Sequence, residues 1–262
     1  MMKKLTIKPK ILITGASSGI GKALAELYIK KGHVVALLAR RESLLKEIKE
    51  TAPKHFQKNI YIYACDIRKK NHLQNSIKSY LSEVGRIDCV IANAGISESS
   101  PGSLLDSSIY ERIYDINVLG SVYTFEAVIP HMIQNKSGHL VSISSLASFR
   151  GLPESGAYCS SKAALSSLTE SLRLDLKSHG IDVSLINPGF IKSPMTDKNL
   201  FYMPQLLETS KGAKKIYAAI KKKRKVYSFP NPLAWVVAQL RYLPPFIYDF
   251  LLKNKKNKKR TK

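Results

Sequence analysis

The sequence predicts an α/β protein built on one doubly wound parallel sheet, and three observations indicate this fold class. Six short runs rich in Val and Ile alternate with helix-like segments, which is typical of parallel βαβ units whose strands are buried on both faces. A glycine-rich turn joins the first run to the first helix-like segment. The 262 residues, 44% of them hydrophobic, are enough for one large core.

Each predicted strand is one of these apolar runs. They are KILIT (10–14), HVVALLA (33–39), NIYIYAC (59–65), DCVIAN (88–93), HLVSIS (139–144) and DVSLIN (182–187). Apolar residues spaced at i, i+3, i+4 and i+7 predict a first helix over 19–31, which Gly32 ends. Residues 107–134 and 155–178 predict two long helices in the same way, the second followed by Gly180. After Asn187 we expect irregular structure and then helix.

Composition and charge narrow the class of protein. Three cysteines at unrelated spacings argue against a disulfide framework, and six histidines without a nearby ligand partner predict no metal site. The chain has no run of about 18 uncharged apolar residues, and its first apolar run is too short for a signal peptide, so we expect a cytoplasmic protein. Residues 211–262 hold 16 of the 42 Lys and Arg but only one acid, Asp249, which predicts an anionic partner surface for this end.

The turn TGASSGIG (14–21) predicts a nucleotide-binding site, because it follows a strand and opens a helix. Gly15 permits a tight exit from the strand. Gly19 and Gly21 leave room for a pyrophosphate to approach backbone N–H groups and for the helix to pack on the sheet. A plain turn of small residues is the alternative.

The end of the second strand indicates which dinucleotide binds. A site that prefers NAD places a carboxylate here for the ribose 2′-OH, but this chain reads LLARR, with Ala39 at that position. A guanidinium can bind a 2′-phosphate with two hydrogen bonds, so we infer NADP(H), with Arg40 as the phosphate ligand and Ser17 as a supporting hydroxyl. Alternatively, Arg40 and Arg41 are solvated charges that open the next helix.

Tyr158 and Lys162 lie four residues apart and therefore project from one face of the predicted helix 155–178. A neighbouring cation favours the phenolate and lowers the pKa of a tyrosine, which makes the pair a candidate acid or base. Taken alone, this spacing is common on any helix.

Four motifs together resemble the short-chain dehydrogenase/reductase family over about residues 10–229. TGASSGIG is similar to the family's TGxxxGxG, NAG (93–95) to its NAG, YCSSK (158–162) to its YxxxK, and NPG (187–189) to the PG after its sixth strand. The resemblance implies a Rossmann fold in a single catalytic domain, residues 1–229, with residues 230–262 as an extension. It also implies homo-oligomers that pair through helices such as 107–134 and 155–178.

The resemblance implies roles for individual residues. Tyr158 would be the general acid/base, Lys162 would lower its pKa and bind the nicotinamide ribose, and Ser145 would polarise the substrate carbonyl, with Ser144 as the fallback. Asn117 would hold a water in the proton relay. Together, the glycine-rich turn, the LLARR pattern and the resemblance predict these cofactor contacts: Gly15, Ser17, Ser18, Gly19, Ile20, Gly21, Arg40, Asp66 at the adenine, Asn93, Ala94, Gly95, Tyr158, Lys162, Pro188, Ile191 and Thr196.

These residues predict an NADP(H)-dependent oxidoreductase that transfers a hydride between the nicotinamide and a carbonyl or secondary alcohol. Apolar side chains after NPG suggest a substrate wall and hence an apolar, lipid-like substrate, although simple packing would explain them as well: Phe190, Met195, Leu200, Phe201, Tyr202 and Met203. The alternative is a non-catalytic NADP sensor or membrane adaptor on the same fold, which would not need an acidic phenol.

Residues 230–262 depart from the family's compact ending. An apolar and aromatic stretch, interrupted by Pro244 and Pro245, is followed by a tail of Lys and Arg. Such a segment suits an interfacial helix on an anionic membrane surface, which would make the protein peripheral on the inner membrane face. Two alternatives remain: helices that pack over the cleft or on an oligomer mate beside a solvated tail, and non-specific contact with nucleic acid, which we do not expect.

Overall fold

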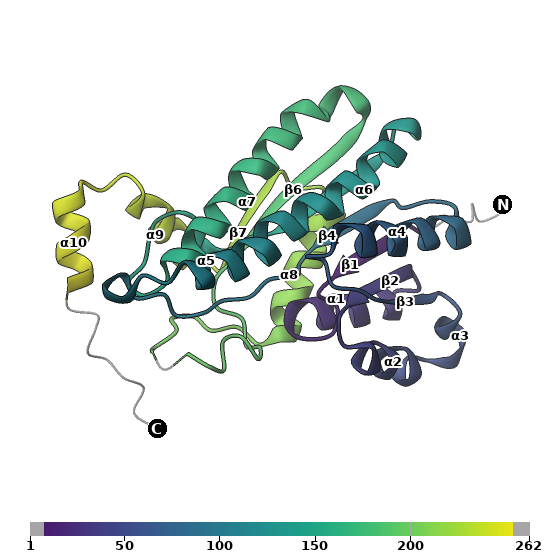
Figure 1. Cartoon of the computed structure of the whole chain (residues 1–262), viewed down its shortest axis with the longest axis horizontal. Helices are drawn as coiled ribbons and strands as arrows, with labels where there is room; N and C mark the ends of the chain where they lie inside the picture. Colours follow the sequence, from purple (N-terminus) through teal and green to yellow (C-terminus); the bar gives the residue numbers. More distant parts are fainter. Residues whose placement is uncertain (1–7, 200, 254–262) are drawn as a thin grey trace.

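The structure, a computed structural model, describes residues 8–199 and 201–253, so Leu200 and the tail beyond Lys253 lie outside the described residues. The described residues form one seven-stranded sheet with the strand order β3-β2-β1-β4-β5-β6-β7 (Figure 1). All neighbouring strands are parallel. The strands are β1 (Lys10–Thr14), β2 (Val34–Ala39), β3 (Ile60–Ala64), β4 (Cys89–Ala92), β5 (Gly138–Ile143), β6 (Ile181–Pro188) and β7 (Val226–Phe229). The predicted fold class is confirmed.

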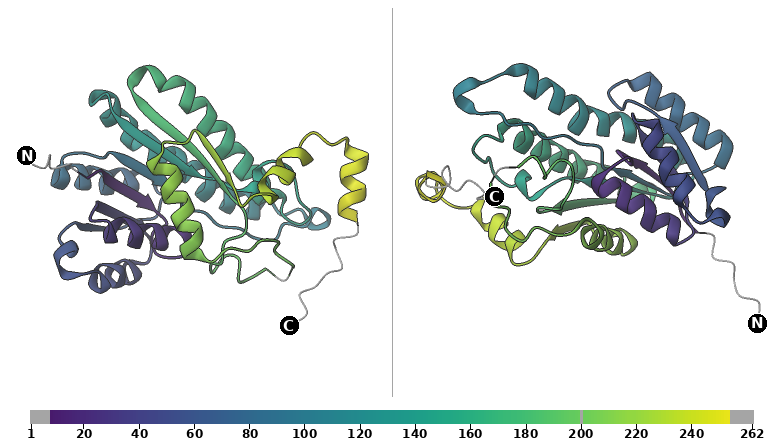
Figure 2. Two further views of the ribbon diagram at one scale, coloured as in Figure 1. Left: turned by 180° about the vertical axis from the view of Figure 1, so that it is seen from behind. Right: turned by 90° about the horizontal axis from the view of Figure 1, so that it is seen from below.

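Helices cover both faces of the sheet (Figures 1 and 2). One face carries α1 (Gly19–Lys30), α2 (Glu42–Thr51) and α8 (Thr209–Lys221). The other face carries α4 (Lys70–Val84), α6 (Gly120–Gln134) and α7 (Gly156–Asp175). The short helix α3 (Lys54–Gln57) lies between α2 and β3, and α5 (Ser107–Tyr114) precedes α6.

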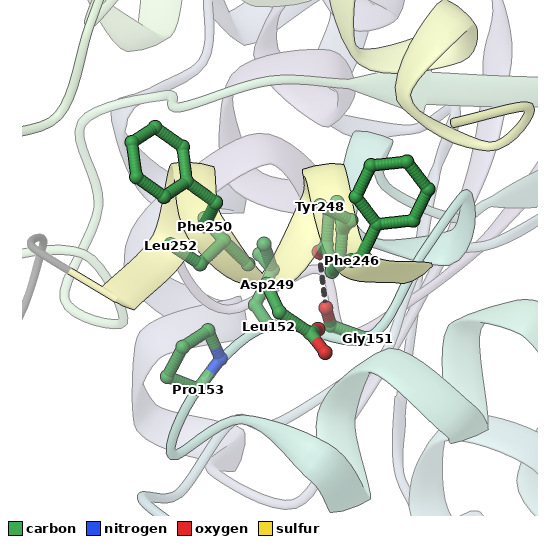
Figure 3. A pocket seen from close by; sticks show the side chains of 8 residues that line it. All are labelled: Gly151, Leu152, Pro153, Phe246, Tyr248, Asp249, Phe250 and Leu252. Atoms are coloured by element: carbon green, nitrogen blue, oxygen red, sulfur yellow. Dashed lines mark hydrogen bonds between the residues drawn. The ribbon is translucent and has the colours of Figure 1, made fainter. Parts of the chain in front are cut away.

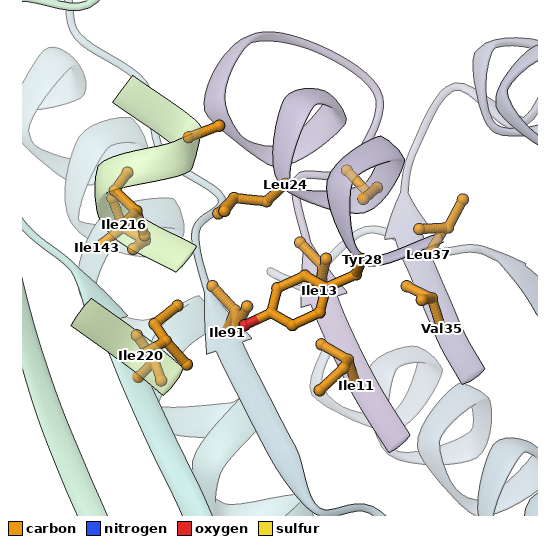
Figure 4. Close-up of a cluster of buried hydrophobic side chains, with 14 of the residues drawn as sticks. Ile11, Ile13, Leu24, Tyr28, Val35, Leu37, Ile91, Ile143, Ile216 and Ile220 are labelled. Atoms are coloured by element: carbon orange, nitrogen blue, oxygen red, sulfur yellow. The ribbon is translucent and has the colours of Figure 1, made fainter. Parts of the chain in front are cut away.

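Alternating residues of the strands contribute to two separate hydrophobic cores, one on each face of the sheet. Ile11 and Ile13 of β1 face α1 and α8, where they pack with Leu24, Tyr28 and Ile216 (Figure 4). Leu12, between them, faces the opposite core, which includes Phe125 and Met132 of α6. Because both faces of each strand are buried, the strands are apolar throughout, as the sequence indicated.

The segment 107–134 is not the single long helix that periodicity predicted. It consists of α5, a π-helical turn over Asp115–Leu119, and α6. A π-helical turn holds one more residue than an α-helical turn, so a broad apolar pattern spans it without a visible interruption. The segment 155–178 agrees better with the predicted single helix. Helix α7 ends at Asp175, and a 3₁₀ turn, Lys177–His179, leads to Gly180 at φ +71°.

The C-terminal apolar stretch forms two helices, α9 (Leu233–Leu240) and α10 (Pro245–Lys253), separated at the proline pair. Ala234 of α9 is buried, whereas α10 projects at one end of the molecule (Figure 1). Within residues 8–199 and 201–253, no helix has the length and apolarity needed to cross a bilayer. The division of the chain between residues 229 and 230 stays a prediction.

Candidate active site

The candidate site lies at the carboxyl ends of β1, β4, β5 and β6, where the glycine-rich turn and the other motifs meet. Gly15 and Gly19 adopt left-handed backbone conformations at φ +66° and φ +54°. A Cβ on Gly15 would lie 2.7 Å from the Cα of Ala94, and one on Gly21 would lie 2.2 Å from the carbonyl oxygen of Gly15. Side chains are therefore excluded at Gly15 and Gly21, and the turn leads directly into the N-terminus of α1.

Thr14 joins the glycine-rich turn to the NAG motif. Its hydroxyl accepts hydrogen bonds from the backbone N–H groups of Asn93 (3.1 Å) and Ala94 (3.2 Å). The Asn93 amide donates in turn to the carbonyl oxygens of Thr14 (3.0 Å) and Gly15 (3.3 Å). Thr14 is 1% exposed, and sequence reasoning missed its role, although the T that opens the motif was visible.

The arginine at the glycine-rich turn is Arg41 and not Arg40. Arg41 donates one guanidinium N–H group to Ser17 Oγ and Ser18 Oγ, both at 3.1 Å. Arg40 is exposed and has no hydrogen bond to the turn among the described residues. Arg40 instead lies near Asp66, whose pKa its charge lowers, so Arg41 is a second candidate for the 2′-phosphate and the assignment to Arg40 stays a prediction.

Asp66, after β3, is held by Arg68 through a side-chain pair of 2.6 Å between Arg68 Nη2 and Asp66 Oδ2. This hydrogen-bonded pair lowers the pKa of the carboxyl despite its partial burial, and the nearby charge of Arg40 adds to the effect. Asp66 is thus ionised and fixed near the edge of the turn, where the resemblance expected the adenine ring.

Ser144 and Ser145 point to different partners. The Ser144 hydroxyl is buried and donates to the carbonyl oxygen of Lys162 at 3.0 Å, inside α7. Ser145 is half-buried, accepts a hydrogen bond from the N–H of Ala147, and lies close enough to the Tyr158 phenol to lower its pKa. The structure therefore brings Ser145, and not the fallback Ser144, to the phenol.

Tyr158 and Lys162 lie on one face of α7, with Lys162 Nζ 5.8 Å from the centre of the Tyr158 ring. Lys162 is only 4% exposed, donates to the carbonyl oxygen of Ile143 at 2.9 Å, and has a pKa that burial lowers to about 8. Burial raises the pKa of Tyr158, and the nearby Ser145 side chain opposes this only in part. The predicted lowering of this pKa by Lys162 stays a prediction, and in this structure the ammonium donates its hydrogen bond to Ile143.

Asn117 lies in the π-helical turn and is fully buried. Its Oδ1 accepts from the N–H of Ile96 at 2.8 Å, and its Nδ2 donates to Ile96 O and Ser161 Oγ, both at 3.0 Å. A Cβ on Gly95 would lie 3.2 Å from Asn117 Oδ1 and 3.3 Å from Lys162 Nζ, so these groups converge on the NAG loop. Ser161 is a further site residue that the sequence did not single out.

The segment after β6 closes over the glycine-rich turn. A Cβ on Gly19 would lie 3.2 Å from the Cβ of Ser193. Thr196 Oγ1 donates to the carbonyl oxygen of Ile191 at 2.9 Å and accepts from Ser193 N–H at 2.8 Å. Pro188 ends β6, and the Ile191 side chain is buried next to Gly212 of α8, so Ile191 faces the protein interior and not the cleft.

The arrangement fits a dinucleotide. The glycine cradle has no room for side chains, helix α1 begins at its edge, and a basic side chain with two serine hydroxyls lies beside it. A phenol, a serine hydroxyl and an ammonium lie together at the far end of the same edge. Such a set can donate a proton to an oxygen and stabilise the negative charge that develops on it.

Comparisons with known proteins agree with this geometry. The family profile described as short chain dehydrogenase matches residues 9–200. An uncharacterized oxidoreductase of Myxococcus xanthus is 37% identical over 238 residues, which cover 91% of this chain and 94% of that protein. The 3-oxoacyl-[acyl-carrier-protein] reductase FabG of Rickettsia typhi is 35% identical over 187 residues, 71% of this chain and 74% of the relative.

Solved structures resemble the whole sheet. ElxO with NADP bound is 27% identical with a TM-score of 0.76, covering 84% of this chain and 96% of the other. A 3-ketoacyl-(acyl-carrier-protein) reductase from Brucella melitensis complexed with NADH has a TM-score of 0.78, covering 87% of this chain and all of the other. At 22% identity, the second comparison bears on the fold alone.

Proposed function

The chain belongs to the short-chain dehydrogenase/reductase family of oxidoreductases, and from this premise we propose that it reduces carbonyl compounds with NADPH. The observation that carries the proposal is the group formed by Ser145, Tyr158 and Lys162 beside a glycine cradle that fits a dinucleotide. We propose the reductive direction because NADPH usually serves as a reductant, with the protonated Tyr158 phenol as the acid.

The chain's own residues account for the proton step. A bound nicotinamide would supply the hydride to the carbonyl carbon. Tyr158 then donates its phenol proton to the carbonyl oxygen, and the Ser145 hydroxyl donates a hydrogen bond to the same oxygen. The Lys162 ammonium stabilises the phenolate that remains, and Asn117 holds the NAG loop against Lys162. Run backwards, the same steps oxidise a secondary alcohol.

NADP(H) is the proposed cofactor because of the residues beside the turn. No carboxylate ends β2, where Ala39 stands, and Arg41 already lies within hydrogen-bonding distance of Ser17 and Ser18. These three side chains can bind a 2′-phosphate together. ElxO, among the similar structures, carries NADP, which supports the same choice.

The proposed substrate is apolar and lipid-like. Phe190 and Phe201 pack edge to face with ring centres 5.9 Å apart, Met203 is buried next to them in sequence, and Tyr202 is exposed. This segment would form one wall of the cleft. The Rickettsia relative acts on 3-oxoacyl chains according to its name, which is consistent with such a wall.

The experiment measures NADPH absorbance loss against a panel of carbonyl compounds: 3-oxoacyl thioesters, ketosteroids, retinal-like aldehydes and sugars. We expect turnover with an apolar member of the panel and a preference for NADPH over NADH. Tyr158→Phe is the matched control, since it keeps the ring and removes the acid. Full activity in that variant would overturn the assignment, and cofactor binding without any turnover would favour the non-catalytic sensor.

We also propose that the protein is a cytoplasmic homo-oligomer and that residues 230–262 associate with an anionic membrane surface. The net positive charge of this segment and its apolar stretch support the membrane proposal. Co-sedimentation with liposomes, with and without residues 254–262, tests it. If removal of the basic tail leaves lipid binding unchanged, electrostatic attraction is not the cause.

A further inference from the structure

Arg150 connects the C-terminal helices to the loop that carries the candidate catalytic residues. It lies between Ser145 and Tyr158, and its Nη1 donates to the carbonyl oxygens of Leu240 and, at 2.8 Å, Leu243. Its guanidinium carbon lies 3.9 Å from the centre of the Tyr248 ring. The helices α9 and α10 are thereby held in a fixed position beside this loop.

Tyr248 provides a second connection. It is 7% exposed, and its hydroxyl donates to the carbonyl oxygen of Gly151, as Figure 3 shows. Tyr248 is therefore packed against the loop 149–153, and the side of α10 opposite Tyr248 is largely exposed.

That opposite side is aromatic. Phe246 and Phe250 are each 73% exposed, and Figure 3 shows both rings projecting from the same side of α10. Trp235 of α9 is 66% exposed, and Tyr242 in the connection is 79% exposed. Exposed aromatic residues gathered on one segment mark an interaction surface, whereas single exposed apolar side chains do not.

A groove of about 840 Å³ separates α10 from the loop 151–153. Its lining is mostly apolar, with Leu152 and Pro153 on one side and Phe246, Phe250 and Leu252 on the other. Two polar side chains also line it: Tyr248, whose hydroxyl is hydrogen-bonded, and Asp249. The groove has the size of an ordinary ligand pocket, and its apolar part suits a hydrocarbon chain.

The sequence from Arg241 onward is strongly basic. From Arg241 to the end of the chain the sequence holds eight Lys and Arg and a single acid, Asp249. Each basic residue near an anionic leaflet contributes roughly 1 kcal/mol of binding, and aromatic rings suit the interfacial depth. A second copy of this chain would bring the same positive charge to the contact, which disfavours self-association through this face.

We propose that the exposed sides of α9 and α10 dock on an anionic lipid bilayer, with Phe246 and Phe250 at the interface and one acyl chain in the groove. Arg150 keeps the docked helices beside the Ser145–Tyr158 loop, so the candidate active site opens at the membrane surface. The proposal deepens the membrane association stated above and does not depend on the reaction that the enzyme catalyses.

Trp235 makes the test direct, because it is the only tryptophan of the chain. Vesicles of equimolar phosphatidylglycerol and phosphatidylcholine with brominated acyl chains should quench its fluorescence. Vesicles of phosphatidylcholine alone should quench it far less. Binding to the anionic vesicles without acyl-chain quenching would mean that only the basic tail touches headgroups, and this would overturn the proposal.

Matched variants locate the surface. Phe246→Ser with Phe250→Ser should weaken vesicle binding by ~10-fold or more, since two rings no longer leave water. Leu174→Ser is the control, because this leucine of α7 is 72% exposed but lies outside α9 and α10. Equal losses of vesicle binding in the two variants would contradict the proposal. So would a dimer that forms only when Phe246 and Phe250 are present and that does not bind lipid. We expect both variants to consume NADPH at the unchanged rate in lipid-free solution. This measurement separates a failure of membrane docking from a failure of the enzymatic proposal.

Discussion

The helix α7, which carries candidate catalytic residues, buries a charged side chain, whereas the C-terminal helix α10 exposes aromatic side chains. Lys162 of α7 keeps an ammonium in the interior at 4% exposure, whereas Phe246 of α10 holds a phenyl ring in solvent at 73% exposure. Lysines are almost never fully buried without a partner, and several exposed aromatic rings on one helix are equally unusual. Each departure has a cost in stability, so each marks a place where the protein interacts with something other than itself.

The two regions also differ in how they are held. Lys162 lies within a network of buried hydrogen bonds from β5, α7 and the NAG loop. The helix α10 depends mainly on Arg150 and Tyr248. Substitutions around Lys162 should therefore alter the reaction and cofactor binding. Substitutions around Arg150 and Tyr248 should alter the position of α10 and leave the core intact.

The largest effect should come from Tyr158→Phe. Removal of the phenol proton should lower kcat by about 10²–10⁴, the usual contribution of general acid catalysis. NADPH affinity should stay within a few-fold, because the ring itself remains. Steady-state kinetics and fluorescence titration with NADPH check both quantities. A loss of NADPH affinity as large as the loss of kcat would show that Tyr158 is only a cofactor contact and not the acid.

Arg41→Ala should have the next largest effect. Loss of charge-assisted hydrogen bonds of ~1.5–3 kcal/mol should raise the KM for NADPH about 10–100-fold, with little change for NADH. Arg40→Ala is the control, since Arg40 has the same charge but no contact with Ser17 or Ser18. Equal effects of the two substitutions would restore the register predicted from the sequence.

The pH profile should report the buried ammonium. Because burial lowers the pKa of Lys162 to about 8, the side chain is charged below this pH and neutral above it. The reductive kcat/KM should therefore fall about tenfold per unit once the pH exceeds 8, as the ammonium that stabilises the phenolate is lost. Measurement from pH 6 to 10, with NADPH binding followed in parallel, tests this. A flat profile up to pH 10 would mean that Lys162 is not needed in its charged form.

The smallest effects should come from Arg150→Ala and Tyr248→Phe. Loss of the hydrogen bonds to Leu240 and Leu243 should lower the free energy of unfolding by about 1–3 kcal/mol, a few degrees in Tm. Tyr248→Phe removes a single hydrogen bond and should cost about 0.5–1.5 kcal/mol. Thermal melts measure both, and proteolysis should first cleave near α10. A loss of more than ~4 kcal/mol for either would mean that α10 belongs to the main core.

The fold was largely predictable, because parallel strands buried on both faces must be apolar throughout. Runs such as KILIT and DVSLIN have this property and lie within one residue of β1 and β6. The apolar pattern of 107–134 gave no sign of the π-helical turn, since one additional residue hardly changes a broad stripe.

The candidate site was predictable in its motifs and less so in its electrostatics. The spacing of Tyr158 and Lys162 follows from helix geometry, and Ser145 lies near enough to Tyr158 to affect the pKa of its phenol, while its catalytic role stays a prediction. The direction of the pKa shift of Tyr158 did not follow, because burial depends on contacts from distant segments. The contact of Arg41 with Ser17 could not be predicted either, since side-chain direction beyond a strand end depends on local backbone angles, and the assignment of the 2′-phosphate to Arg40 stays a prediction.

The π-helical turn at Asp115–Leu119 changes the direction in which the side chains of α6 point relative to those of α5. One additional residue rotates α6 by about 100° relative to a continuous extension of α5, so Ile113 and Phe125 can both face the interior although they do not share one helical stripe. A deletion of one residue within 115–119 would restore a regular helix and turn the Asn117 carboxamide away from Ile96 and Ser161. This short stretch of chain therefore tolerates substitution better than any change of length.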